Sequence, residues 1–347
     1  MAEPNKLPRL LYKYRGFSHR LLDMLVADEL YYSDPGDFND PLDCRPTLDA
    51  NLPNDQLEQV LSRLREQRVL AEMQAAAKSL RYRGPRTIDH IARHSQKDAA
   101  RLLDEIRYHA TDPSNEIDDP LQSLLRQYLE EELLRRYDRG IVSFGVRATC
   151  PLMWSHYADQ HNGICAGYSV PAGAEADLHK ICYGGSRKVL ASDVAVMEND
   201  SAARGRVDEA VLLRKAASWR YEREWRLIGR RGAQDSPLEL EEVVFGIRCK
   251  STVKFTIVQA LANRGRPVRF FEMREVSGTF HLRKYALDTD ELGASLPRRS
   301  RSIFEAFEDL DKEGSIRISY AHGLTGRIPT AAARTARGVG CLGSTAR

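Results

Sequence analysis

The sequence lacks any long apolar run. None of its hydrophobic stretches approaches the roughly 18 residues that a membrane-spanning helix needs. The first residues, MAEPNKLPRLLYKYRG, contain no apolar segment of signal-peptide length. We therefore expect a protein that has no membrane partner and acts in the cytoplasm.

Familiar cofactor and metal motifs are missing as well. There is no P-loop, no GxGxxG and no nucleophile elbow, and the six cysteines are scattered without a CxxC pair or a zinc spacing. In a reducing compartment such cysteines are expected to be free thiols, mostly buried. The 52 basic and 49 acidic residues leave a net charge of +3, which is too small to indicate a nucleic-acid-binding protein by itself.

What the chain does have is a series of short strands interrupted by one long helical region. Apolar residues repeat at helical spacing between 54 and 138, where Gly, Pro and Asp breaks predict about three helices. Ser18 is a suitable N-cap for a further helix, and others are predicted at 152–158, 207–218 and 251–262. Strands are predicted at 10–14, 29–33, 140–146, 164–170, 178–183, 238–247, 268–276 and 279–287.

These patterns predict an α+β fold with a mixed, mostly antiparallel sheet in two parts. Residues 1–53 and 139–288 are expected to form the core domain, and residues 54–138 a helical insertion that covers it. Residues 289–347 are rich in Arg, Ser, Gly and Ala, which predicts a weakly ordered tail with one short helix near 303–310.

The segment 219–229 (WRYEREWRLIG) has the most suggestive pattern. If it is a strand, its side chains alternate between two faces. Glu222, Glu224 and Arg226 would then share one face, while Trp225 and Leu227 would anchor the other. Such a strand would carry two acids and a base into one place. Alternatively, the two acids lie on a half-exposed strand and pair with neighbouring arginines.

The two early strands carry further candidates. Lys13 and Arg15 would lie on one face of the first strand, where fixed cations suit a phosphate group. Tyr32 and Ser33, on the second strand, suit a ribose or an aromatic ring. The alternative is that Lys13 and Arg15 are solvated on an edge strand, and that Tyr32 and Ser33 only precede a turn.

Two other polar groups leave alternatives open. The loop 34–43, which contains Asn39, is rich in oxygen ligands, but it lacks the EF-hand spacing, so turn formation is the simpler interpretation and no metal site is predicted. Trp154, His156 and Tyr157 form a polar and aromatic cluster. His156 is either a general acid or base or a packed, hydrogen-bonded side chain.

Five blocks occur in a telling order: 11–15; 30–35 with 38–43; 142–144; 154–158 with 161–163; and 221–226. Together they resemble a bacterial family called domain of unknown function 2971. The resemblance covers roughly residues 10–285 and omits the helical region between the blocks. The family name implies no activity.

The layout of polar residues also resembles that of ADP-ribosyltransferases. These enzymes place a basic or His residue on an early strand, a Ser or Tyr on the next, and a Glu on a late strand. Their arginine-modifying branch has Glu-x-Glu there. In this chain Lys13 or Arg15, then Tyr32 and Ser33, and finally the pair at 222 and 224 take these places, although the Ser-Thr-Ser triplet is absent.

This second resemblance implies NAD as the cofactor. Glu224 would hold the hydroxyls of the nicotinamide ribose and stabilise the positive charge that develops during cleavage. Glu222 would orient or deprotonate the nucleophile, helped by a pKa that the neighbouring carboxylate raises. Cofactor contacts would come from Lys13, Arg15, Tyr32, Ser33, Asn39, Trp154, His156, Tyr157 and Arg226.

Three hypotheses follow. The first is an ADP-ribosyltransferase-like enzyme whose acceptor is a protein side chain, a nucleic acid or water, with a cleft where the first two strands meet Glu222 and Glu224. The second is a nucleic-acid-binding protein acting in phage defence, which the arginines of 296–347 favour. The third is a non-catalytic module that binds a partner.

Overall fold

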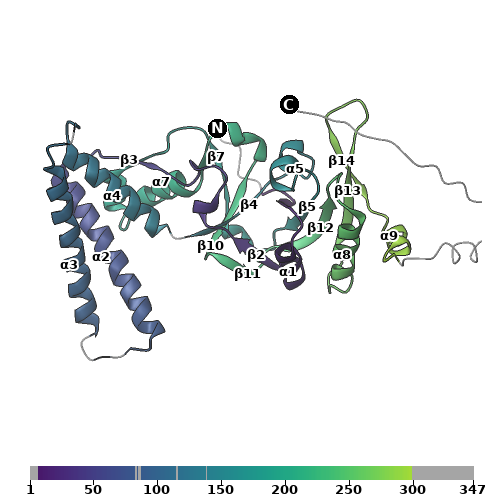
Figure 1. The fold of residues 1–347 in the computed structure, drawn as a ribbon, viewed down its shortest axis with the longest axis horizontal. Helices are drawn as coiled ribbons and strands as arrows, with labels where there is room; N and C mark the ends of the chain where they lie inside the picture. The colour runs from purple at the N-terminus through teal and green to yellow at the C-terminus, as the bar shows by residue number, and fades with distance from the viewer. Residues whose placement is uncertain (1–6, 83, 85–86, 115, 138, 299–347) are drawn as a thin grey trace, which may run out of the picture. The chain divides into compact units, whose positions relative to one another are not determined.

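The computed structural model describes residues 7–298 except 83, 85–86, 115 and 138 (Figure 1). The described residues as far as Leu296 form one compact unit. The description below concerns this unit. The helix expected near 303–310 lies outside the described residues.

The largest sheet has five strands, in the order β1 (Leu11–Arg15), β5 (Ile164–Ser169), β12 (Glu239–Phe245), β13 (Arg269–Glu275) and β14 (Leu282–Ala286). All its pairs are antiparallel except β12 with β13. A parallel pair needs a long crossover, and α8 (Ser251–Leu261) lies within it. The last two predicted strands form the antiparallel pair of β13 and β14.

A second sheet has three antiparallel strands, β4 (Gly140–Phe144), β10 (Trp225–Gly229) and β6 (Leu178–Lys180), with β10 in the centre. Single bridges from Tyr12 to Gly145 and from Ser33 to Ile141 join β1 and the end of β2 to β4. The predicted α+β class and the mostly antiparallel, divided sheet are confirmed.

Three short strand pairs complete the unit. β2 (Glu29–Tyr32) pairs with β11 (Gly232–Asp235) in antiparallel fashion. β3 (Thr47–Asp49) pairs with β8 (Lys188–Leu190), and β7 (Cys182–Tyr183) with β9 (Arg214–Lys215), both in parallel. Leu48 of β3 and Val189 of β8 belong to the core that the helices of 54–138 share.

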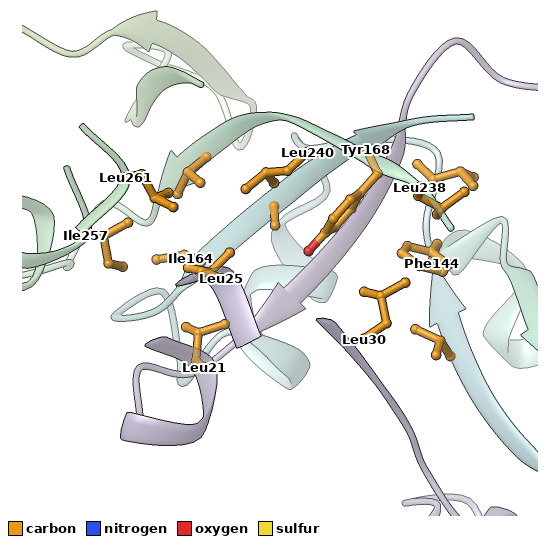
Figure 2. Packing of buried hydrophobic residues seen from close by; sticks show 14 of the residues in the cluster. Leu21, Leu25, Leu30, Phe144, Ile164, Tyr168, Leu238, Leu240, Ile257 and Leu261 are labelled. Atoms are coloured by element: carbon orange, nitrogen blue, oxygen red, sulfur yellow. The ribbon is translucent and has the colours of Figure 1, made fainter. Parts of the chain in front are cut away.

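The main hydrophobic core lies between the five-stranded sheet and two helices. The hydroxyl of Ser18 caps α1 (His19–Ala27) by accepting from the backbone N–H of Leu21 at 3.2 Å, as predicted. Figure 2 shows Leu21 and Leu25 of α1 near Ile164 of β5, with Ile257 of α8 in the same cluster. This packing fixes the position of β1 and its polar side chains.

The helical region 54–138 contains α2 (Asn54–Ser79), α3 (Thr87–Ala110) and α4 (Pro120–Arg136). Their apolar faces share a core with α6 (Ala191–Val196) and α7 (Ser201–Leu212). Glu132 is buried and accepts hydrogen bonds from Arg65 and Arg68 at 2.6–3.0 Å. The three predicted helices are therefore present and packed.

Two local predictions differ from the structure. The helix expected at 207–218 is α7, which begins and ends six residues earlier, because Asp200 caps its first turn through the N–H groups of Ala202 and Ala203. Thr289–Ser295, which lie in the expected tail, form α9 with the N-cap Asp288. Among the described residues, no helix is long and apolar enough to cross a bilayer.

Candidate active site

A cavity of about 500 Å³ lies where β1 and β4 meet. Its walls also come from the turn η1 (Pro35–Asp37) and the loop after it, from α5 (Pro151–Tyr157), and from the segment that joins β9 to β10. A volume of this size suits a small-molecule ligand. Of the residues predicted for the site, Lys13, Arg15, Ser33, Asn39, His156, Tyr157, Glu222 and Glu224 line it.

One wall is cationic. Lys13 and Arg15 are half-buried, and the ammonium of Lys13 donates to the backbone carbonyl of Ser143 at 2.8 Å. Within the described residues, neither Lys13 nor Arg15 has a carboxylate within 4.0 Å. Burial lowers the pKa of Lys13 well below its usual value, and the neighbouring Arg15 lowers it further. An anion bound between them would remove both costs.

Another part of the lining is a buried cluster of charges. Lys215 Nζ lies 2.6 Å from Glu222 Oε2, 3.0 Å from Glu224 Oε2 and 3.4 Å from Asp43 Oδ2. Arg226 donates from Nε to Glu224 Oε1 and from a terminal nitrogen to Asp43 Oδ2, both at 2.7 Å. With two cations and three carboxylates, all nearly inaccessible, the cluster carries one excess negative charge when every group is ionised.

The two glutamates have different electrostatics. Burial raises the pKa of Glu222, and the charge of Lys215 offsets this only in part. Burial would also raise the pKa of Glu224, but the charges of Arg226 and Lys215 outweigh it and lower the pKa to about 2. The lowered pKa favours the ionised form of Glu224, whereas the raised pKa makes Glu222 the carboxylate of the pair that takes up a proton more readily.

The hydrogen bonds of the two glutamates also distinguish them. Glu222 Oε1 accepts from the hydroxyl of Tyr157 at 2.6 Å, while its other oxygen accepts from Lys215. Glu224 accepts from Arg226 through both oxygens and from Lys215. Because a carboxylate offers about four acceptor sites, Glu222 has more left for a substrate.

Aromatic side chains form the rim beside Glu222. His156 packs against Trp219 and Tyr221 with ring centroids 6.3 and 6.4 Å apart. The amide of Asn39 donates to the hydroxyl of Tyr157 at 3.3 Å. His156 and Tyr157 project from α5, whose Pro151 occupies a favoured first-turn position. The rim thereby orients the hydroxyl that contacts Glu222.

The structure places three predicted cofactor contacts away from the cavity. Tyr32 is buried in the main core and lies over Gly140 and Gly229. Trp154 is completely buried, and its indole nitrogen donates to the carbonyl of Ala148 at 2.7 Å. Arg226 is completely buried in the charged cluster. These three side chains are packed or ion-paired behind the residues that line the cavity, so they support its walls and do not contact its interior.

The strand expected at 219–229 begins later than predicted. Residues Ala217–Glu222 form the short 3₁₀ helix η3, and β10 begins at Trp225. Between them Arg223 adopts a left-handed conformation with φ 49°. The expectation that Glu222 shares a strand face with Glu224 is therefore wrong, although both carboxylates reach Lys215. The left-handed turn at Arg223 brings them together where strand alternation was expected to do so.

Sequence reasoning missed Lys215, the centre of the charged cluster. It lies in β9, within a segment predicted as helix. The only local signal was a lysine shortly before two glutamates, which does not distinguish a surface pair from a buried one. Across the part of the chain that the structure describes, no group of three or more His, Cys, Asp or Glu side chains is arranged to hold a metal ion.

Comparison with known proteins gives one match. A family model described as a protein of unknown function, DUF2971, matches residues 153–227. These residues run from α5 to β10 and include His156, Lys215, Glu222 and Glu224, and the expected family resemblance is confirmed there. No curated protein and no solved structure has a significant match to the chain.

Proposed function

We propose that this protein is an enzyme that binds NAD in the cavity between β1 and β4 and cleaves its nicotinamide glycosidic bond. The observation that carries the proposal is that cationic and carboxylate side chains line one cavity. Lys13 and Arg15, half-buried without a carboxylate partner among the described residues, face the same cavity as Glu222. A ligand with a diphosphate at one end and a reacting ribose at the other matches both kinds of side chain.

In the proposed reaction, Glu222 is the catalytic carboxylate. The bond between the ribose anomeric carbon and the nicotinamide nitrogen breaks, and its electron pair leaves with nicotinamide. A water or acceptor oxygen then bonds to the anomeric carbon, and its proton passes to Glu222. The excess negative charge of the cluster stabilises the positive charge that develops on the ribose.

Glu224 has a positioning role in this proposal. Its oxygens hold Lys215 and Arg226, and Lys215 in turn fixes Glu222 at 2.6 Å. This assignment keeps the expected role of Glu222 as the base but differs from the ADP-ribosyltransferase layout in its second glutamate, which contacts the ribose in that layout. The difference follows from the acceptor sites still open on each carboxylate.

The test is release of nicotinamide from NAD by the purified protein. Glu222→Gln keeps the size of the side chain and removes the base, so we expect the rate to fall by about 10²- to 10⁴-fold. Glu241→Gln is the control, because Glu241 lies on β12, does not line the cavity, and accepts hydrogen bonds from Ser169 and Arg266. A wild-type protein that releases no nicotinamide, or equal rates in wild type and Glu222→Gln, would refute the proposal.

A further inference from the structure

A second cavity, of about 520 Å³, lies beside the first and has a different chemical character. Arg147 follows β4, Arg220 lies in η3, and Arg223 follows η3. All three side chains are exposed and line this cavity, together with Tyr221 and His281. No acidic residue contributes to its lining.

The three arginines have no counterions in the structure. Within the described residues, none of Arg147, Arg220 and Arg223 has a carboxylate within 4.0 Å, and no side-chain hydrogen bond holds their guanidinium groups. Most other arginines with an assigned partner in this chain pair with acids, as Arg264 does with Asp28. Three like charges in one open pocket repel each other, and a bound anion would relieve the repulsion.

We propose that this second cavity binds the phosphate backbone of a single-stranded nucleic acid. Guanidinium groups bind phosphate oxygens in bidentate fashion and remain charged at any physiological pH. Tyr221 adds a half-buried ring, held in place by Trp219 at 6.0 Å and His156 at 6.4 Å. Arginines next to a preoriented aromatic ring are the combination that binds unpaired bases and their phosphates.

The chain joins the two cavities directly. Tyr221 and Arg223 line the second cavity, while Glu222 and Glu224 line the first. Arg223, which lies between the two glutamates, adopts a left-handed conformation. The arginine and the tyrosine that would contact a bound nucleic acid are therefore the immediate sequence neighbours of Glu222, the carboxylate at the proposed reaction site. That the bound nucleic acid is the acceptor of ADP-ribose rests on the proposed function, whereas its binding to the arginines does not.

The test is fluorescence anisotropy of a labelled oligothymidylate of about 12 nucleotides, without NAD, so that failure of the cleavage reaction cannot affect the result. The double variant Arg147→Ala/Arg220→Ala should bind about 100-fold more weakly, roughly tenfold for each lost charged contact. Its dependence on salt between about 50 and 200 mM should also be shallower, by about 0.7 in the logarithmic slope per lost phosphate contact.

The matched control is Arg126→Ala/Arg230→Ala, which removes the same charge from exposed arginines that line neither cavity. Unfolding temperatures of both variants should equal that of the wild type, because all four side chains are exposed. Equal weakening in the two double variants would overturn the proposal, since binding would then follow net charge alone. Absence of binding by the wild type at about 50 mM salt, or equal affinity for a phosphotyrosine peptide, would overturn it as well.

Discussion

Replacing Arg226 with methionine removes a guanidinium that is completely buried. It donates to Glu224 at 2.7 and 3.2 Å, to Asp43 at 2.7 Å and to the carbonyl of Leu212 at 2.7 Å. The side chains of Glu224 and Asp43 are only 3% and 2% exposed. Methionine approximates the length of the arginine stem, so the main loss is the charge and its hydrogen bonds.

The expected cost is about 3–5 kcal/mol of unfolding free energy, because the change leaves buried carboxylates without their cation. Three carboxylates would then share Lys215 alone. Arg226→Lys keeps the positive charge but loses the forked guanidinium, so its unfolding free energy should lie between those of the wild type and Arg226→Met. The measurement is urea unfolding followed by tryptophan fluorescence.

Arg206→Met is the matched control for this comparison. Its guanidinium also pairs with a carboxylate, Asp193, at 2.6 Å, but the arginine is 56% exposed. Its loss should cost much less than the loss of Arg226, because solvent screens an exposed ion pair. Equal costs for Arg226→Met and Arg206→Met would refute the conclusion that the cluster is desolvated and held together by Arg226.

Two further predictions concern acid stability and backbone spacing. The pKa of Glu224 is lowered from 4.5 to about 2, so its contribution to the free energy of unfolding, about 3 kcal/mol, is present above pH 4.5 and lost as the pH falls towards 2. The stability of Glu224→Gln should therefore decline less steeply in acid than that of the wild type. Equal slopes in an acid titration of the two proteins would contradict the pairing. Gly163→Ala should destabilise the protein by at least about 1 kcal/mol, since its Cβ would lie 2.2 Å from the carbonyl oxygen of Arg15. Gly205→Ala, in open space within α7, should stabilise the protein by roughly 0.5–1 kcal/mol. Thermal unfolding of both variants is the measurement, and a stabilised Gly163→Ala would contradict the close approach.

Local sequence signals predicted most of the fold. Alternating residues marked β1, Ser18 marked the start of α1, and leucines at helical spacing marked the helices of 54–138. These features depend on neighbours in the chain. The left-handed turn at Arg223 does not, because neither its residue type nor its neighbours demand that conformation. The shared contact of Glu222 and Glu224 with Lys215 accompanies it.

The candidate site was predictable to a similar extent. Lys13, Arg15 and Glu222 were expected in one cleft because their order resembles the ADP-ribosyltransferase layout, and the structure brings them to one cavity. Whether a polar or aromatic side chain lines that cavity or lies inside its wall depends on packing depth. Sequence spacing does not reveal depth, which is why Trp154 and Arg226 were expected to contact a cofactor.

The most direct test of anion binding in the first cavity is a calorimetric titration of the protein with NAD. Lys13→Met and Arg15→Met should each weaken binding by about tenfold or more, since each removes a charged contact to phosphate. Lys97→Met, on an exposed face of α3, should leave the affinity unchanged. Saturable binding that is lost only in the two cavity variants is the predicted result, and no binding of NAD to the wild type, or equal affinities in all four proteins, would contradict it.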